Sequence, residues 1–187
     1  MTAPDLESIV SAVLARPPRC GSVRVLAIDG GAGSGKSTLA ADLIAALRAI
    51  GSAELVATDD LLDGWADQFG FWPRLRSQVL APLAAGRPAG YRRYDWTAGR
   101  FGEPVVSFPP PDVLVVEGVS AIAACGRWAG LRLLLEVGRR ERLARWIARD
   151  GLGADRPVPV EWMRWLDAED RYFTAALRDS ADLVLTN

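Results

Sequence analysis

The chain has 187 residues, a length typical of one domain with a full hydrophobic core. Its 22 basic and 23 acidic residues give a net charge of −1, so no overall positive field favours nucleic acid or an anionic membrane as a partner. Histidine is absent, which excludes histidine general bases and histidine-ligated zinc, and the two cysteines are too few for a disulfide framework.

The N-terminal segment predicts a leading helix over residues 3–15, because its apolar residues recur at the spacing of one helical face. Acidic residues interrupt this segment, which argues against a signal peptide. No apolar run approaches the ~20 residues that a membrane span needs, so we expect a cytoplasmic protein. The sequence leaves open whether the chain forms a homo-oligomer.

Apolar runs alternate with helical patterns along the rest of the chain. The predicted strands cover residues 23–28, 53–58, 112–118, 131–137 and 181–187. The predicted helices cover residues 36–50, 73–85, 139–150 and 160–180. Residues 86–111 are rich in Gly, Pro, Tyr and Arg, and we expect an irregular loop with room for a short hairpin. Strands that are apolar throughout, separated by helices, predict an α/β fold: a doubly wound, five-stranded parallel sheet with helices on both faces.

The stretch AIDGGAGSGKST (residues 27–38) fits the pattern G-x-x-x-x-G-K-[ST], with a predicted strand before it and a helix after it. Its glycines allow several backbone N–H groups to converge on one anion, at the positive end of the helix. Lys36 is the only lysine of the chain, and its compact ammonium fits between two phosphates where a planar guanidinium is too broad. Residues 30–38 therefore predict a phosphate loop that binds a nucleoside triphosphate.

The nucleotide is expected to contact most of this loop. The residues concerned are Gly31, Ala32, Gly33, Ser34, Gly35, Lys36, Ser37 and Thr38. The Ser37 hydroxyl is also expected to ligate Mg²⁺. A guanine-reading Asn-Lys-x-Asp run is absent, because the single lysine lies in the loop, so ATP is favoured over GTP.

Further motifs follow in order along the chain: TDDLLDGW (58–65), YRRYDW (91–96), VLVVEG (113–118), RLARWIARD (142–150) and ADLVL (181–185). Together with the phosphate loop, they resemble the uridine kinase-like group of P-loop kinases, which includes relatives of phosphoribulokinase, pantothenate kinase and nicotinamide riboside kinase. The resemblance implies a nucleoside-kinase-like fold with a small lid. It also implies that the γ-phosphoryl group of ATP, with Mg²⁺, is transferred to a hydroxyl of a small nucleoside-like metabolite.

Three carboxylates are predicted near the phosphate loop. Asp59 and Asp60 follow the second predicted strand, at the sheet edge where ligands collect in open α/β sheets, although either could cap a turn. The resemblance favours Asp59 as the general base, with a share in holding Mg²⁺, and leaves Asp60 as a substrate contact. Glu117 ends a buried strand, where a carboxylate needs a partner or a metal, so it is expected to hold hydrated Mg²⁺ unless its role is purely structural.

Arginines at helical spacing predict a lid over residues 142–160. Arg142, Arg145 and Arg149 fall on one helical face and are similar to the arginine-rich lid helix of the kinase group. Arg145 and Arg149 are expected to neutralise the charge on the transferring phosphoryl group, and Arg156 is expected to contact the nucleotide. A solvated basic face is the alternative interpretation.

The acceptor is expected to bind within residues 59–101. Trp65 and Trp96 offer flat surfaces on which a ring could stack. Tyr94 and Asp95 are similar to the Tyr-Asp substrate motif of the kinase group, so both are predicted to contact the substrate.

The sequence departs from the uridine kinase pattern after this motif. The run YDWTAGRF lacks the histidine that uridine kinases use on the nucleoside. The acceptor is therefore open, and a vitamin, a sugar acid or a nucleoside monophosphate is an alternative to a nucleoside. A non-kinase ATPase that changes shape on hydrolysis is the alternative from a different functional class. The tryptophans of the last predicted helix are interpreted as core or lid packing.

Overall fold

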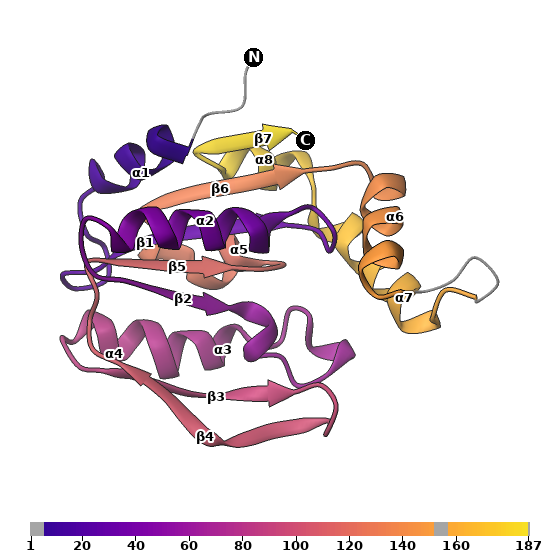
Figure 1. The fold of residues 1–187 in the computed structure, drawn as a ribbon, viewed down its shortest axis with the longest axis horizontal. Helices are drawn as coiled ribbons and strands as arrows, with labels where there is room; N and C mark the ends of the chain where they lie inside the picture. Colours follow the sequence, from indigo (N-terminus) through magenta and orange to yellow (C-terminus); the bar gives the residue numbers. More distant parts are fainter. Residues whose placement is uncertain (1–5, 152–156, 187) are drawn as a thin grey trace.

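A computed structural model of the protein describes residues 6–151 and 157–186. Its centre is a five-stranded sheet with all strands parallel, in the order β2-β5-β1-β6-β7 (Figure 1). The strands are β1 (Arg24–Gly30), β2 (Ala53–Ala57), β5 (Val113–Glu117), β6 (Leu131–Glu136) and β7 (Leu183–Thr186). The predicted α/β fold with a five-stranded parallel sheet is confirmed.

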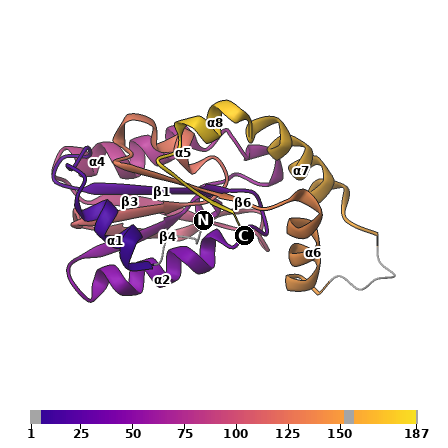
Figure 2. The same ribbon diagram turned by 90° about the horizontal axis from the view of Figure 1, so that it is seen from above.

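Helices cover both faces of the sheet (Figure 2). They are α1 (Leu6–Leu14), α2 (Lys36–Arg48), α3 (Trp72–Leu75), α4 (Ala81–Ala84), α5 (Ala121–Cys125), α6 (Arg139–Arg149), α7 (Val160–Tyr172) and α8 (Ala175–Ser180). Leu26 and Ile28 of β1 belong to the core under α1 and α2, whereas Val25 and Ala27 face the core formed with α5 and α7. None of these helices, within the described residues, is both long and apolar enough to cross a membrane.

The sequence predicts an irregular loop with room for a short hairpin in residues 86–111. The hairpin is present, but it is longer than expected and replaces most of the predicted loop. An antiparallel two-stranded sheet forms there, from β3 (Ala89–Asp95) and β4 (Arg100–Phe108). Pro104 is tolerated because a two-stranded sheet has only edge strands. Tyr91 and Phe108 are buried beneath the hairpin, and this long-range packing outweighs the weak strand propensity of the local sequence.

The other predicted elements are present with shifted ends. The predicted helix 73–85 is a continuous helical segment in which α3 and α4 flank a π-helical turn, Arg76–Leu80. The predicted helix 160–180 is broken into α7 and α8, and the side chain of Thr174 caps the start of α8. The leading helix is described from Leu6, because the first residues of its predicted span 3–15 lie outside the described part.

The carboxyl ends of β1, β2 and β5 meet at one edge of the sheet, and α6 and α7 lie beyond this edge (Figure 1). Gly118, directly after β5, has a φ of 143°, and a Cβ at this position would overlap the side chain of Thr58 after β2. Only glycine allows the two strand ends to approach so closely. The approach brings the segments that carry Asp59 and Glu117 to the same place.

Candidate active site

The phosphate loop connects β1 to α2, and its glycines adopt backbone conformations that other residues rarely reach. Gly33 and Gly35 have φ values of 78° and 93°, in the left-handed region that favours glycine. α2 begins at Lys36, directly after Gly35, so the first N–H groups of this helix have no acceptor within the helix. The loop is therefore a preformed anion site at the positive end of α2.

The side chain of Lys36 lies inside this loop. Lys36 is only 8% exposed, and its Nζ donates to the carbonyl oxygen of Gly31 at 3.3 Å. The loop backbone thus holds the ammonium at the place where phosphates would meet it.

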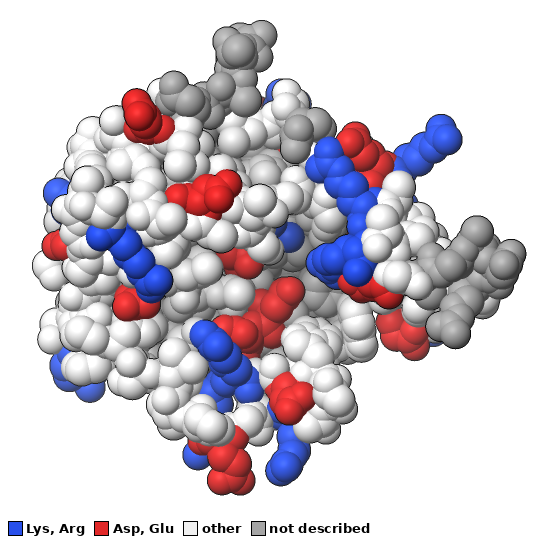
Figure 3. Space-filling view, in the orientation of Figure 1, with Lys and Arg blue, Asp and Glu red and all other residues white. Residues whose placement is uncertain are grey.

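A cavity of about 450 Å³ opens in front of the loop, between the sheet edge and α6. Figure 3 shows this hollow, with acidic and basic side chains facing each other across it. The predicted site residues that line the cavity are Ala32, Gly33, Gly35, Lys36, Ser37, Thr38, Asp59, Trp65, Trp96, Glu117, Arg145 and Arg149. Gly31 and Ser34 belong to the loop but are buried and do not line this cavity.

Glu117 has the surroundings of a magnesium ligand. Its Oε1 accepts a hydrogen bond from Ser37 Oγ at 3.2 Å, whereas its Oε2 is buried and makes no hydrogen bond within the described residues. Burial raises the pKa of Glu117, and the ammonium of Lys36 opposes this effect. The residues present fit Mg²⁺, a hard cation that takes one or two protein oxygens, waters and phosphate oxygens. Ser37 and Glu117 would hold the ion, with Asp59 on the same cavity wall.

Asp59 and Asp60 have different surroundings although they are adjacent in the sequence. Asp59 is exposed and lines the cavity. Asp60 turns toward β3, where its Oδ2 accepts from the hydroxyl of Tyr91 at 3.3 Å and pairs with Arg93 Nε at 3.0 Å. Burial raises the pKa of Asp60, and the Arg93 charge opposes this effect. Asp59 is therefore the carboxylate available to an acceptor, while Asp60, predicted as a substrate contact, braces the hairpin.

The three arginines expected on one open face of the lid separate in the structure. Arg145 and Arg149 line the cavity and pair with neighbouring acids of their own helix segment, at 2.6 Å each. Arg142 is buried and pairs with Glu169 of α7, so its assignment to the open face is wrong. Helical spacing placed Arg142 on the same face as Arg145 and Arg149, but its pairing with Glu169, a buried carboxylate on α7, takes it out of the cavity. Arg156 lies outside the described residues.

Tryptophans form the apolar wall of the cavity. Trp65 and Trp96 meet edge to face with ring centroids 5.1 Å apart, and Trp96 Nε1 donates to the carbonyl oxygen of Asp59 at 3.3 Å. Trp65 also contacts Trp146 and Trp165, at centroid distances of 6.2 and 5.7 Å. Trp146 and Trp165 line the cavity as well, a role that the sequence did not indicate because their partner lies about 80 to 100 positions away.

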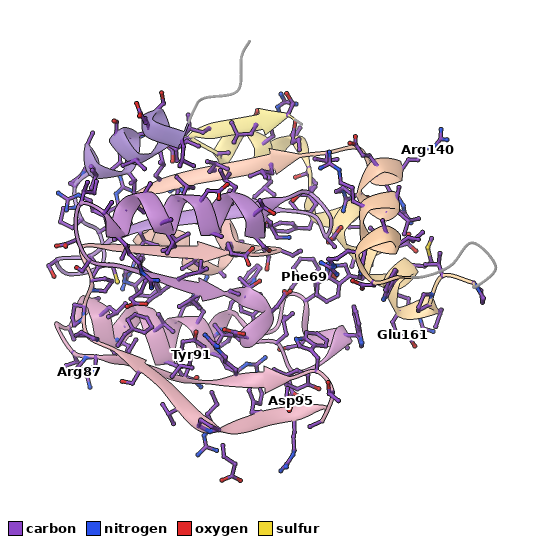
Figure 4. The ribbon with its side chains drawn as sticks, viewed as in Figure 1. Phe69, Arg87, Tyr91, Asp95, Arg140 and Glu161 are labelled. Carbon is purple, nitrogen blue, oxygen red and sulfur yellow. The ribbon has the colours of Figure 1, made fainter. Side chains whose placement is uncertain are left out.

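Tyr94 and Asp95, predicted as substrate contacts, do not line the cavity. The ring of Tyr94 packs edge to face on Trp96, with centroids 5.1 Å apart, behind the cavity wall. Asp95 lies at the turn of the β3–β4 hairpin (Figure 4), where its Oδ1 accepts the N–H groups of Thr97 and Ala98 at 2.9 Å each. The structure thus gives Asp95 the ordinary role of a turn-capping acid.

Asp29 supports the segment that leads into the phosphate loop, a role that the sequence reasoning missed. It is the penultimate residue of β1, is fully buried, and accepts the N–H groups of Gly30, Ser120 and Ile122 at 2.8, 2.9 and 3.0 Å. The hydroxyl of Tyr172 on α7 donates to it at 2.7 Å. The sequence could have indicated this role, because Asp29 directly follows an apolar strand and a buried carboxylate needs several hydrogen-bond donors.

Solved structures of two proteins have the same architecture as this chain. A candidate uridine kinase from Bacillus stearothermophilus aligns with a TM-score of 0.69 at 22% identity, over 96% of each chain. A candidate fructose transport system kinase from Silicibacter sp. TM1040 aligns with a TM-score of 0.61 at 22% identity, over 98% of this chain and 100% of that chain. The chain has the fold of the P-loop kinases. No family model and no curated protein matches the sequence.

Asp29 makes a testable contribution to the pH dependence of stability. Burial raises its pKa from 3.8 to about 6, against the pull of its four donors. The native protein therefore holds this proton more tightly than the unfolded chain. This proton adds about 3 kcal/mol to the free energy of unfolding. The contribution is fully present below pH 3.8 and is lost as the pH rises through 6.

Asp29→Asn removes this titration. We expect the variant to be less stable than the wild type, because its amide group faces four donors, and we expect the difference in unfolding free energy to grow as the pH falls from 7 to 4. Denaturant unfolding of both proteins across this pH range measures the difference. A difference that stays constant would contradict the raised pKa.

Proposed function

We propose that the protein is an ATP-dependent kinase that transfers the γ-phosphoryl group to a hydroxyl of a small, ring-bearing molecule. The observation that carries this proposal is the composition of one cavity. It combines the phosphate loop with Lys36, the exposed carboxylate of Asp59, and the guanidinium groups of Arg145 and Arg149. The fold shared with the candidate kinases supports it.

The phosphate loop would bind the triphosphate of ATP. The free N–H groups at the start of α2 would donate hydrogen bonds to the phosphate oxygens, and the Lys36 ammonium would bridge the β- and γ-phosphates. Mg²⁺ held by Ser37 and Glu117 would neutralise charge on the phosphate oxygens. The buried Oε2 of Glu117 without a hydrogen bond supports this assignment.

Asp59 would act as the general base. The acceptor hydroxyl loses its proton to the Asp59 carboxylate while its oxygen attacks the γ-phosphorus and the bond to the leaving ADP oxygen breaks. Arg145 and Arg149, which face the loop from α6, would stabilise the charge on the transferring phosphoryl group. These roles need no movement of β-strands, because all the groups already line one cavity.

The acceptor would stack on the tryptophan wall next to Asp59. Trp65 and Trp96 are 43% and 39% exposed, and stacking is worth about 1–3 kcal/mol per base where it has been measured on nucleic acids. A neutral acceptor is favoured because Asp59 and Glu117 would repel a second phosphate. Three arginines of the acceptor segment are already bound by the protein: Arg93 pairs with Asp60, Arg74 donates to the carbonyl oxygen of Leu61, and Arg76 donates to those of Ala123 and Ala124.

Turnover of ATP in the presence of Mg²⁺ and a panel of candidate acceptors tests the proposed function. The panel contains nucleosides, nucleoside monophosphates, sugars and ring-bearing vitamins. We expect one neutral, hydroxylated ring compound to stimulate ADP release strongly and to gain the mass of one phosphoryl group. ATP turnover that no acceptor stimulates would instead indicate a shape-changing ATPase. A preference for monophosphates would make the protein a nucleotide kinase.

Lys36→Arg tests the fit of the phosphate loop. The broader guanidinium cannot occupy the space of a side chain that is only 8% exposed, so we expect kcat to fall at least ~10²-fold although the positive charge is kept. Arg48→Lys is the matched control at the other end of α2, where the side chain is half exposed, and should leave kcat unchanged. Near-normal turnover of Lys36→Arg would contradict the geometric explanation of the single lysine.

Asp59→Asn and Asp60→Asn test which of the two adjacent carboxylates is the general base and which one binds the β3–β4 hairpin. We expect Asp59→Asn to lower kcat by ~10²-fold or more with little effect on the KM for MgATP, because the loop binds the nucleotide. Asp60→Asn should leave kcat close to the wild-type value, because Asp60 does not line the cavity and is bound by Tyr91 and Arg93 instead. Steady-state kinetics and thermal unfolding of both variants test this. A larger loss of kcat in Asp60→Asn than in Asp59→Asn would reassign the base.

A further inference from the structure

One N–H group of the phosphate loop is already occupied by a distant carboxylate. The N–H of Ala32 donates to Oε1 of Glu169, on α7, at 2.7 Å, although the two residues are 137 positions apart. Oε1 of Glu169 also accepts from Trp165 Nε1 at 2.7 Å. Glu169 is fully buried, so this contact is not a fluctuating surface pair. It fixes the tip of the loop to α7.

The same carboxylate pairs with Arg142, and the pair holds both polar groups of Ala32. Oε2 of Glu169 accepts from Arg142 Nη1. The same Nη1 lies 3.5 Å from the carbonyl oxygen of Ala32 and donates to it. Arg142 Nε donates to the carbonyl oxygen of Val137, between β6 and α6, at 3.1 Å. The N–H and the C=O of one loop residue are therefore bound by two oppositely charged, buried side chains.

The glycines on either side of Ala32 show how closely α6 approaches the loop. A Cβ at Gly31 would overlap the guanidinium of Arg142, and a Cβ at Gly33 would overlap the carbonyl oxygen of Arg142. These two glycines are thus needed for contact with α6 as well as for the backbone curvature of the loop. The loop and the lid helix touch directly.

α7 also contacts the entrance of the loop. Tyr172 follows Glu169 by three positions, so both residues lie on one face of α7. The hydroxyl of Tyr172 donates to Asp29 at 2.7 Å, and Asp29 accepts the N–H of Gly30 at 2.8 Å. One helical face therefore holds the loop at its start and at its tip.

We propose that Glu169 is a positioning residue that fixes the phosphate loop in its nucleotide-binding conformation and couples it to α6. This inference rests on the proposed kinase function. Arg142, held by Glu169, sets the rotation of α6, and the same helix presents Arg145 and Arg149 to the cavity. A nucleotide bound to the loop would thereby meet arginines that are already oriented.

The affinity for a nucleotide tests the proposal without any acceptor. Glu169→Gln keeps the size of the side chain and one acceptor oxygen, but it removes the buried charge that faces Arg142. The second acid near Arg142, Asp170 at 3.7 Å, is half exposed and stays in place. Isothermal titration calorimetry with Mg²⁺ and β,γ-imido-ATP should give a Kd about tenfold higher than that of the wild type. Glu161→Gln, exposed on the same helix (Figure 4), is the matched control and should keep the wild-type Kd.

The outcomes distinguish this inference from the proposed function. If Glu169 served stability alone, Glu169→Gln would lower the unfolding temperature and leave the Kd unchanged, which would overturn the positioning role. A wild type that does not bind the analogue would contradict the proposed function itself.

Amide hydrogen exchange tests the same proposal on the wild-type protein, so it does not depend on whether a variant folds. The Ala32 N–H should be protected before the analogue is added and gain no further protection from it, because Glu169 already accepts this group. The N–H groups of Lys36, Ser37 and Thr38 should become protected only with the analogue. An Ala32 N–H that exchanges freely and is protected by the analogue would overturn the proposal.

Discussion

The buried pair of Glu169 and Arg142 is the constraint on which the candidate site depends. It lies where α6, α7 and the phosphate loop meet, and it binds the backbone of Ala32 on both sides. A buried ion pair adds little net stability, because removing two charges from water costs about as much as their attraction returns. Removing one partner of a buried pair typically costs about 3–5 kcal/mol. Loss of Glu169 would leave Arg142 with only the half-exposed Asp170, 3.7 Å away. The main effect of the pair is therefore to fix the relative positions of α6, α7 and the phosphate loop.

Charge is divided across the cavity in a way that suits phosphoryl transfer. Asp59 and Glu117 lie at the sheet edge, whereas Arg145 and Arg149 come from α6 on the opposite side, with Lys36 between them in the loop. The carboxylates would hold the metal and the acceptor proton, and the cations would meet the phosphates. The tryptophan wall forms the apolar side of the same cavity.

Local signals in the sequence predicted the parts of the site that depend on local structure. The phosphate loop, the five strands and Glu117 follow from short patterns, because each pattern carries its own strand, turn or helix start. Asp60, Asp95 and Arg142 were assigned with less success, because their partners decide their roles. Asp60 is bound by Arg93 of the β3–β4 hairpin, a segment whose Gly- and Pro-rich composition indicated mostly loop. Arg142 is bound by Glu169 from the next helix. No spacing rule within one segment reveals such contacts.

A crystal structure with Mg²⁺ and β,γ-imido-ATP tests the central claim most directly. It should show the triphosphate against the N–H groups at the start of α2 and the Lys36 ammonium between the β- and γ-phosphates. Mg²⁺ should contact Ser37 and lie beside Glu117, with Ala32 still bound to Glu169. A triphosphate bound elsewhere, or a loop that releases Glu169 in order to bind it, would contradict the claim that this loop is a preformed kinase site.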